Sequence, residues 1–476
     1  MRRAILLAVA LAGCTVGPDY SGPPEVAPAA ASSPNFRRVG LAPVVSTSPV
    51  ARWWTGLDDP VLTSLIEIAL DNGTTVRATQ ARLRRARAVV SEDRAGLFPQ
   101  GSASGLALHS RLPTGSLTGS QGGSSATKLD LYSVGFDASW ELDLFGGTRR
   151  GIEGARARAE AEEAALADAQ VQLAAEVAQT YVKLRAAQRR EELYRQTGEI
   201  ERGVLHLTSQ RRSLGSTSQA DVERLTTQLD QTLADTTQVR AEADQYLDQI
   251  ATLVGLEPGE LDNQLARPAS IPLPPAMVSI GDPVALLRRR PDIRQAERQL
   301  AASNAQIGQA VAQYFPSVSL FGTIGFGGTD ASRFFSSSSL AYLGGPSISW
   351  NFLGFGRTSA RVDQARAGRD EAAEQYRQVV LGALRDAETS LSRFGHQRET
   401  LLRLTSAEAA AGRAAALTRE RQQAGTASLA DVLDTERQRV QTEQSVVQAR
   451  AALTNSFISL QKALGLGWGT PDRSGL

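Results

Sequence analysis

A short phrase rich in small and acidic residues occurs twice in the sequence. It reads GSTSQADV at 215–222 and GTASLADV at 425–432, with an offset of 210 residues (from 215 to 425). Each copy carries a carboxylate, Asp221 in the first and Asp431 in the second. Carboxylates at a restricted site can attract cations and repel anions. Two interpretations are open: a site that acts on ions, or a turn between two helices.

The residue types also suit such a turn. Glycine can take a positive φ and end a helix. A serine with an acid three residues later forms a capping box at the start of the next helix. The residues in these roles are Gly215, Ser218 and Asp221 in the first copy, and Gly425, Ser428 and Asp431 in the second. Asp434 is not duplicated, because Arg224 stands at the matching position.

Other chemistry has little support in this sequence. His109, His206 and His396 are far apart, and Cys14 is the single cysteine. No nucleophile elbow, phosphate loop or zinc motif is present. We therefore predict no catalysis, no cofactor and no bound metal. The formal net charge of +1 gives no electrostatic reason to expect a nucleic-acid partner.

The first residues resemble a bacterial lipoprotein signal. A basic start, MRR, precedes a short apolar run that ends in LAGC. We predict a signal peptide at 1–13 and lipidation of Cys14, followed by a Pro- and Ser-rich tether at 14–55. Thr15 after the cysteine suits delivery to the outer membrane. One lipid chain anchors weakly, so a second membrane element is expected.

The rest of the chain is two copies of one unit. WELDLFGGT at 140–148 matches WNFLGFGRT at 350–358 at the same offset of 210, whereas LFP at 97–99 matches YFP at 314–316 at an offset of 217. The first copy therefore has about seven extra residues in a loop. We predict repeats at 56–255 and 283–465, a connector at 256–282 and a C-terminal tail at 466–476.

Each repeat is expected to contain a helix, two strands, a long helix, a turn and a final helix. The strands are predicted at about 101–112, 130–142, 317–327 and 340–352, and the turns at 213–219 and 423–429. Apolar and small polar residues alternate in the strands, as in a membrane barrel, although strand pattern alone would also allow a soluble sandwich. No later segment has about 20 uninterrupted apolar residues. The signal and the long helices favour the membrane interpretation.

Four strands are too few to close a barrel, and an open sheet edge in lipid is costly. Subunits must therefore share one barrel. The predicted fold class is mainly α, with long helices and a membrane β-barrel portion. Tyr132, Trp140 and Trp350 could belong to an aromatic belt at the bilayer interface, although ordinary packing explains each of them equally well.

The whole chain resembles the TolC/OprM family of outer-membrane efflux channels, in its lipidated NodT-like branch. The motifs that carry the resemblance are CTVGPDY (14–20), WELDLFG (140–146), RRPDIRQAERQLAASNAQIGQAVAQYFPSVSL (289–320), GTASLADVLDTE (425–436) and ALGLGW (463–468). The resemblance implies a homotrimer with a twelve-stranded barrel in the outer-membrane lipid and a helical tunnel across the periplasm. It also implies a periplasmic adaptor and an inner-membrane pump of the RND class as partners.

The resemblance further implies roles for the two turns. The tips, with Gly215, Ser218, Gly425 and Ser428, would dock the adaptor. Asp434 matches an aspartate that lines the periplasmic aperture in the family, with Asp431 and Asp221 as weaker candidates. A passive exit duct for drugs or small toxic compounds is the expected function. The alternatives are a type I secretion duct for polypeptides and a periplasmic structural lipoprotein without a pore.

Overall fold

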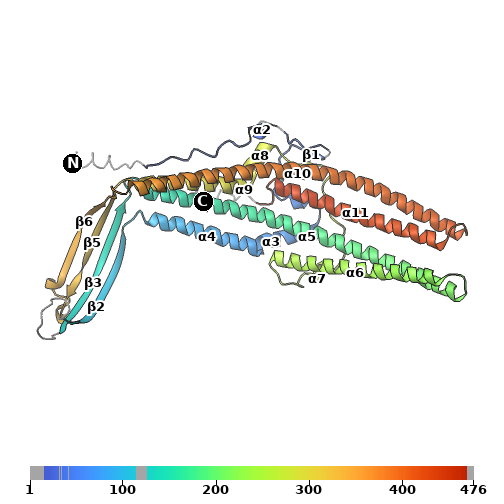
Figure 1. The fold of residues 1–476 in the computed structure, drawn as a ribbon, viewed down its shortest axis with the longest axis horizontal. Helices are drawn as coiled ribbons and strands as arrows, with labels where there is room; N and C mark the ends of the chain where they lie inside the picture. Colours follow the sequence, from blue (N-terminus) through green and yellow to red (C-terminus); the bar gives the residue numbers. More distant parts are fainter. Residues whose placement is uncertain (1–14, 32, 34, 41, 114–125, 469–476) are drawn as a thin grey trace. The chain divides into compact units, whose positions relative to one another are not determined.

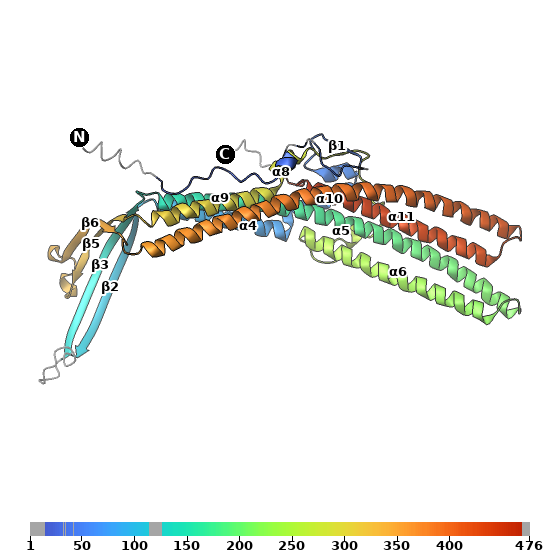
Figure 2. The same cartoon turned by 45° about the horizontal axis from the view of Figure 1, so that its top comes forward.

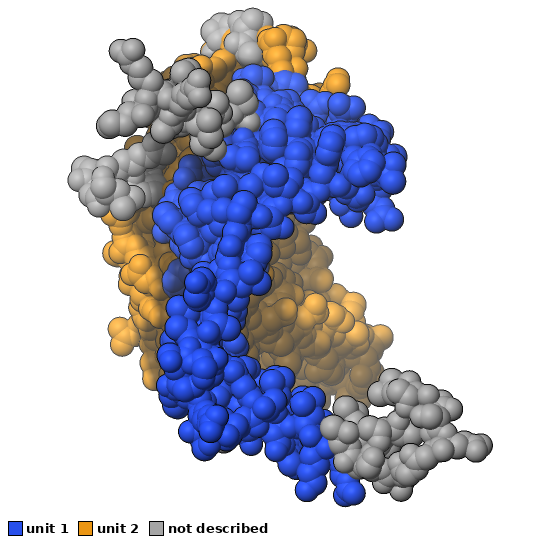
Figure 3. Space-filling model, turned by 90° about the vertical axis from the view of Figure 1, so that its left-hand side faces the viewer, with its two compact units in different colours: residues 1–24, 84–161, 296–375 blue, residues 25–83, 162–295, 376–476 orange. Residues whose placement is uncertain are grey.

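The structure is a computed structural model that describes residues 15–31, 33, 35–40, 42–113 and 126–468. The chain divides into two compact units (Figure 3). Unit 1 is built from the described parts of 1–24, 84–161 and 296–375. Unit 2 is built from those of 25–83, 162–295 and 376–476. Each unit therefore takes segments from both sequence repeats.

Unit 1 contains an antiparallel sheet of four strands in the order β2-β3-β5-β6 (Figures 1 and 2). The strands are β2 (Gln100–Pro113), β3 (Ala126–Leu142), β5 (Ser317–Gly328) and β6 (Leu340–Ser349). The four predicted strands are thus present, although the last ends one residue before Trp350. Two one-turn 3-10 helices, η3 (Ala331–Arg333) and η4 (Ser337–Ser339), lie between β5 and β6.

The register of the sheet shows which side chains share a face. Val134 pairs with Phe326, and Ile324 pairs with Tyr342, so these apolar residues of β3, β5 and β6 lie on one face, as the alternation predicts. Leu129, Leu131, Phe321 and Leu343 lie on the opposite face. The first strand differs. Leu106 pairs with Ser133, which places the leucines of β2 on the opposite, polar face. The apolar face of β2 instead carries small residues such as Ala107.

Four helices contribute to unit 1: α4 (Thr74–Ala95), α5 (Gly147–Ser213), α9 (Pro291–Ala312) and α10 (Phe355–Gln423). Their contacts within this unit are made largely by alanine. Ala155 and Ala159 of α5 pack with Val90 of α4, and Ala157 packs with Ala301 and Ala302 of α9. Small side chains allow helices to approach closely. Of the helices in the described residues, none is both long and apolar enough to cross a membrane.

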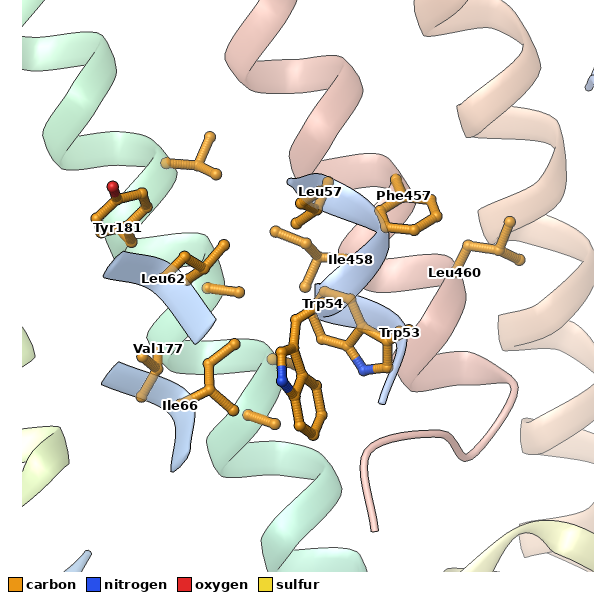
Figure 4. Close-up of a cluster of buried hydrophobic side chains, with 14 of the residues drawn as sticks. Trp53, Trp54, Leu57, Leu62, Ile66, Val177, Tyr181, Phe457, Ile458 and Leu460 are labelled. Carbon is orange, nitrogen blue, oxygen red and sulfur yellow. The ribbon is translucent and has the colours of Figure 1, made fainter. Parts of the chain in front are cut away.

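Unit 2 holds the main hydrophobic core (Figure 4). Trp53 and Trp54 of η1 (Trp53–Leu57) are buried beside Phe457 of α11 (Leu429–Ala463), and Tyr181 of α5 lies near Leu62 of α3 (Pro60–Asn72). The remaining elements are α2 (Pro28–Ala31), β1 (Val44–Val45), α6 (Gln219–Val254), α7 (Asp262–Leu265), β4 (Val278–Ser279) and α8 (Pro283–Arg289). Strand β1 pairs with β4 in parallel, which joins the N-terminal segment to the predicted connector.

The N-terminal segment, predicted from its composition to be a tether, is fixed to the rest of the chain by contacts. In unit 1, the buried Arg150 side chain donates to the carbonyls of Val16 and Gly17 and to Asp19 Oδ1, the last at 2.6 Å. Gly17 has φ +91° and lies close to Gly308, because a β-carbon added to Gly17 would be 2.5 Å from the Cα of Gly308. These contacts hold residues 16–19 in place, and the tether prediction is corrected accordingly.

The same correction applies to the N-terminal segment in unit 2. Phe36 is buried, and the backbone N–H groups of Arg37 and Arg38 each donate to one carboxylate oxygen of Glu388 at 2.8 Å. Trp53 and Trp54 also belong to the predicted tether, and both lie in the core. Composition misled because the segment packs a few aromatic side chains into the core of unit 2 and donates backbone N–H groups to Glu388, without forming a core of its own.

Candidate functional site: the helical turns and the sheet

The two turns end their first helices with the same geometry. Gly215 has φ +75° and Gly425 has φ +77°. In the first copy the N–H of Ser216 donates to the carbonyl of Arg211 at 2.9 Å; in the second, Thr426 donates to Arg421 at 2.8 Å. This is a Schellman motif, in which the left-handed glycine lets the chain satisfy the last helical carbonyls. The predicted helix-ending role of both glycines is confirmed.

The next helices begin with capping boxes in both copies. The backbone N–H of Asp431 donates to Ser428 Oγ at 3.1 Å, and that of Asp221 donates to Ser218 Oγ at 3.2 Å. Bonds from the backbone N–H and then the hydroxyl of Ser428 hold the pKa of Asp431 below its ordinary value. The hydroxyls of Ser218 and Thr217 lower the pKa of Asp221. Both carboxylates therefore stay charged and cap the helices to which they belong.

Asp434 is placed differently from these two acids. It is exposed, and within the described residues no hydrogen bond or ion pair involves it. Its neighbour Leu433 is buried against Val204 and Leu225, so the helix turns its apolar side inward and Asp434 outward. Its carboxylate is therefore available to water and ions in the isolated chain, unlike Asp221 and Asp431.

A chain of ion pairs links three helices above the second turn. Glu436 of α11 is 6% exposed and contacts Arg419 of α10 and Arg439 of its own helix, the latter at 2.8 Å. Arg439 also reaches Glu443 at 3.0 Å, and Glu443 contacts Arg189 of α5 at 2.7 Å. Hydrogen bonding to Glu436 raises the pKa of Arg439. This network was not predicted from the sequence, although the spacing of Glu436, Arg439 and Glu443 is a helical ion-pair signal.

The three residues of this network that lie on α11 have no charged counterparts in the first repeat. At the offset of 210, the positions of Glu436, Arg439 and Glu443 are occupied in the first repeat by Thr226, Leu229 and Leu233. The asymmetry therefore extends from Asp434 to Glu443, about two and a half turns of the helix. At the three network positions the second copy carries charge where the first carries threonine or leucine.

The two predicted interface tryptophans make equivalent contacts. The indole N–H of Trp140 donates to the carbonyl of Leu97 at 2.9 Å, and that of Trp350 donates to Tyr314 at 3.1 Å. Leu97 and Tyr314 are the first residues of the duplicated LFP and YFP motifs. Each tryptophan thus bonds the end of one strand to the segment that precedes another strand in the same half. Tyr132 lies farther along β3 on the apolar face of the sheet.

The lipidation candidate Cys14 lies outside the described residues. The contacts of Val16 begin two residues later, where its N–H donates to the carbonyl of Phe145 at 3.1 Å. No group of three or more potential metal-ligating side chains occurs in the described chain.

The chain has two duplicated halves, long helices and a four-stranded sheet with apolar residues on one face. Together these features define the fold of a membrane channel. The family model "Outer membrane efflux protein" matches residues 65–256 and 283–466, and the chain belongs to this family. It is 30% identical over 468 residues to Nodulation protein T of Rhizobium leguminosarum bv. trifolii, covering 98% of this chain and 97% of that one. It is 31% identical over 432 residues to the pyoverdine export outer membrane protein OpmQ of Pseudomonas aeruginosa, covering 90% of each.

Solved structures agree with this assignment. The outer-membrane channel OprN is similar with a TM-score of 0.82 and 36% identity, covering 96% of this chain and 100% of that one. The open state of the Neisseria gonorrhoeae MtrE outer membrane channel has a TM-score of 0.76 and 26% identity, covering 95% and 98%. The predicted family, fold class, efflux function and outer-membrane location are confirmed. Both solved structures are described as channels, not as enzymes.

Proposed function

We propose that this chain is the outer-membrane component of a tripartite efflux pump and serves as a passive exit duct for drugs or small toxic compounds. The observation that carries the proposal is the pairing of a sheet with one apolar face and long duplicated helices in a member of the outer membrane efflux family. The duct itself catalyses no reaction. Energy comes from the inner-membrane pump, which a periplasmic adaptor joins to the duct.

The duct is a homotrimer in this proposal. Strands β2 and β6 each have only one neighbour in the four-stranded sheet, so each has one open edge. Backbone groups cannot remain unpaired in lipid, and three copies would close the edges by pairing β6 of one subunit with β2 of the next. The result is a barrel of twelve strands. Phe136 and Ile348, which are 68% and 71% exposed in one chain, lie on the face that would meet lipid.

The periplasmic aperture lies at the turns in this proposal. Three copies of Asp434 near the axis would attract cations and repel anions. Asp431 and Asp221 are the weaker candidates because their carboxylates already cap α11 and α6. The tips with Gly215, Ser218, Gly425 and Ser428 would present two rigid helical turns to the adaptor.

Deletion of the gene in the bacterium that encodes it tests the exit duct against type I secretion. An exit duct predicts faster accumulation of lipophilic fluorescent compounds in deleted cells, restored by the intact gene, with unchanged secreted polypeptides. Unchanged accumulation together with loss of one secreted polypeptide would favour the secretion duct.

A further inference from the structure

The β2–β3 hairpin carries a graded row of side chains on the apolar face of the sheet. Three alternate cross-strand pairs follow one another toward the loop: Ala107 with Tyr132, His109 with Asp130, and Arg111 with Lys128. Since alternate pairs share a face, all three lie on the side of Val134 and Phe136. The face therefore changes from apolar to aromatic, then to an ion pair, and finally to two cations.

The outermost pair places two positive charges directly opposite each other. Arg111 and Lys128 are both exposed, and like charges at such positions destabilise a sheet. The acid on this face, Asp130, already contacts His109. Among the described residues neither cation has an ion-pair partner, and the loop sequence TGSLTGSQGGSS at 114–125 contains no acid. Within the described residues the pair therefore has no counter-charge.

The position of this pair along the strand indicates what could supply the counter-charge. From Trp140 to Lys128 is twelve residues of β3, or roughly 40 Å at about 3.3 Å per residue. A strand tilted by about 40° covers roughly 30 Å of membrane thickness over that length, close to that of the hydrocarbon core. With Trp140 at one interface, Arg111 and Lys128 reach the headgroups of the opposite leaflet.

The orientation of the hairpin selects the leaflet. Helices α4 and α5 join the sheet on the side of Gln100 and Leu142, whereas Pro113 and Ala126 form the opposite end of the β2–β3 pair (Figure 2). With the helices in the periplasm, the loop end faces the cell exterior. This step rests on the proposed function. The pairing of β3 with β5 ends at Tyr132 and Gly328, so Arg111 and Lys128 stand beyond the end of β5.

We propose that Arg111 and Lys128 bind a phosphate group of lipid A, the phosphorylated glycolipid of the outer leaflet. A phosphate carries close to two negative charges and several acceptor oxygens. Arg111 can hold two oxygens through its planar guanidinium, and Lys128 adds a point charge from the facing strand. The bound phosphate relieves the repulsion between the two cations, while Tyr132 and the apolar residues below contact the acyl chains.

Native mass spectrometry of the purified trimer with added diphosphoryl lipid A tests this site. The variant R111Q/K128Q is expected to bind at least tenfold more weakly than the wild type. The control R84Q/R85Q removes two exposed arginines from α4 and is expected to bind as the wild type does. Equal binding by R111Q/K128Q and the control would overturn the proposal. If the double variant fails to form trimers, K128Q alone is measured, with at least a threefold loss expected and no loss overturning the proposal.

Three further ligands separate the sources of the phosphate. The wild type and R111Q/K128Q are expected to bind dephosphorylated lipid A equally well. A persisting difference in binding would overturn the phosphate assignment. Phosphatidylglycerol is expected to bind more weakly than lipid A, and equal binding would overturn the choice of lipid. Binding of inorganic phosphate alone as tightly as lipid A would overturn the headgroup source. Ion conductance of R111Q/K128Q is expected to be unchanged, so failure of lipid binding and failure of the channel function are distinguishable.

Discussion

Glu436→Gln removes the central charge of the ion-pair network above the second turn. One carboxylate oxygen of Glu436 contacts Arg419 of α10 and the other contacts Arg439, and the Glu436 side chain is 7% exposed. Glutamine has nearly the same shape but one acceptor oxygen, so it can retain one of the two guanidinium contacts. The other guanidinium then faces an amide N–H₂ group.

The free energy lost in this variant depends on how exposed Arg419 and Arg439 are. A hydrogen bond to a charged group contributes about 1.5–3 kcal/mol. The lower end applies, because Arg419 is 58% exposed and Arg439 keeps its contact with Glu443. We expect the local opening of α10 from α11 to become easier by about 1.5 kcal/mol, which is about tenfold in the opening equilibrium.

Hydrogen exchange measured by mass spectrometry reports this opening. Amides on α10 and α11 around Arg419 and Glu436 are expected to exchange about tenfold faster in the variant, where exchange proceeds by local opening. The control is Glu399→Gln, which removes an exposed pair with Arg403 at 3.9 Å and should change exchange little. Equal effects of the two substitutions would refute the reasoning. So would a double-mutant cycle of Arg419→Gln and Glu436→Gln with no coupling.

Three further predictions concern the turns and the anchor. Asp434→Ala should raise the resting conductance of the purified channel or weaken its block by divalent cations, and an unchanged single-channel record would remove Asp434 from the aperture. Cys14→Ser should abolish incorporation of radioactive fatty acid, and retained label would contradict lipidation. Because their pKa values are lowered, Asp221 and Asp431 stabilise the folded state at pH values above the ordinary aspartate pKa. This stabilisation is lost as the pH falls through the pKa that each carboxyl has in the folded state. Asp431→Ala should therefore lower the urea midpoint of unfolding at pH 6 and have no effect at a pH low enough to protonate the wild-type carboxyl. An equal fall of the midpoint at pH 6 and at the low pH would contradict the capping account.

Features that repeat in the sequence could be predicted well. The turns at 213–219 and 423–429 follow from local chemistry, because glycine, serine and aspartate at fixed spacing end and restart a helix wherever they stand. The strands of the second repeat and β3 show alternation strong enough to fix both their existence and their faces. The duplicated tryptophans, Trp140 and Trp350, were visible as a repeat, but their backbone partners became clear only in the structure.

Features that depend on pairing between distant segments could not be predicted. The leucines of β2 suggested an apolar face, yet the register with β3 sets Leu106 opposite Ser133. A shift of one residue reverses every side chain, and a weakly alternating strand does not specify that choice. The docking of residues 16–19 depends on Arg150, which is more than a hundred residues away and looks like an ordinary surface residue in the sequence.

The most direct test of the account is single-channel recording from the purified protein in planar bilayers, after its trimeric mass has been established. Three subunits that share one barrel predict one conductance step for each inserted trimer. A verified trimer that inserts and passes no ions would contradict the channel, and would leave the periplasmic structural lipoprotein as the better account of this chain.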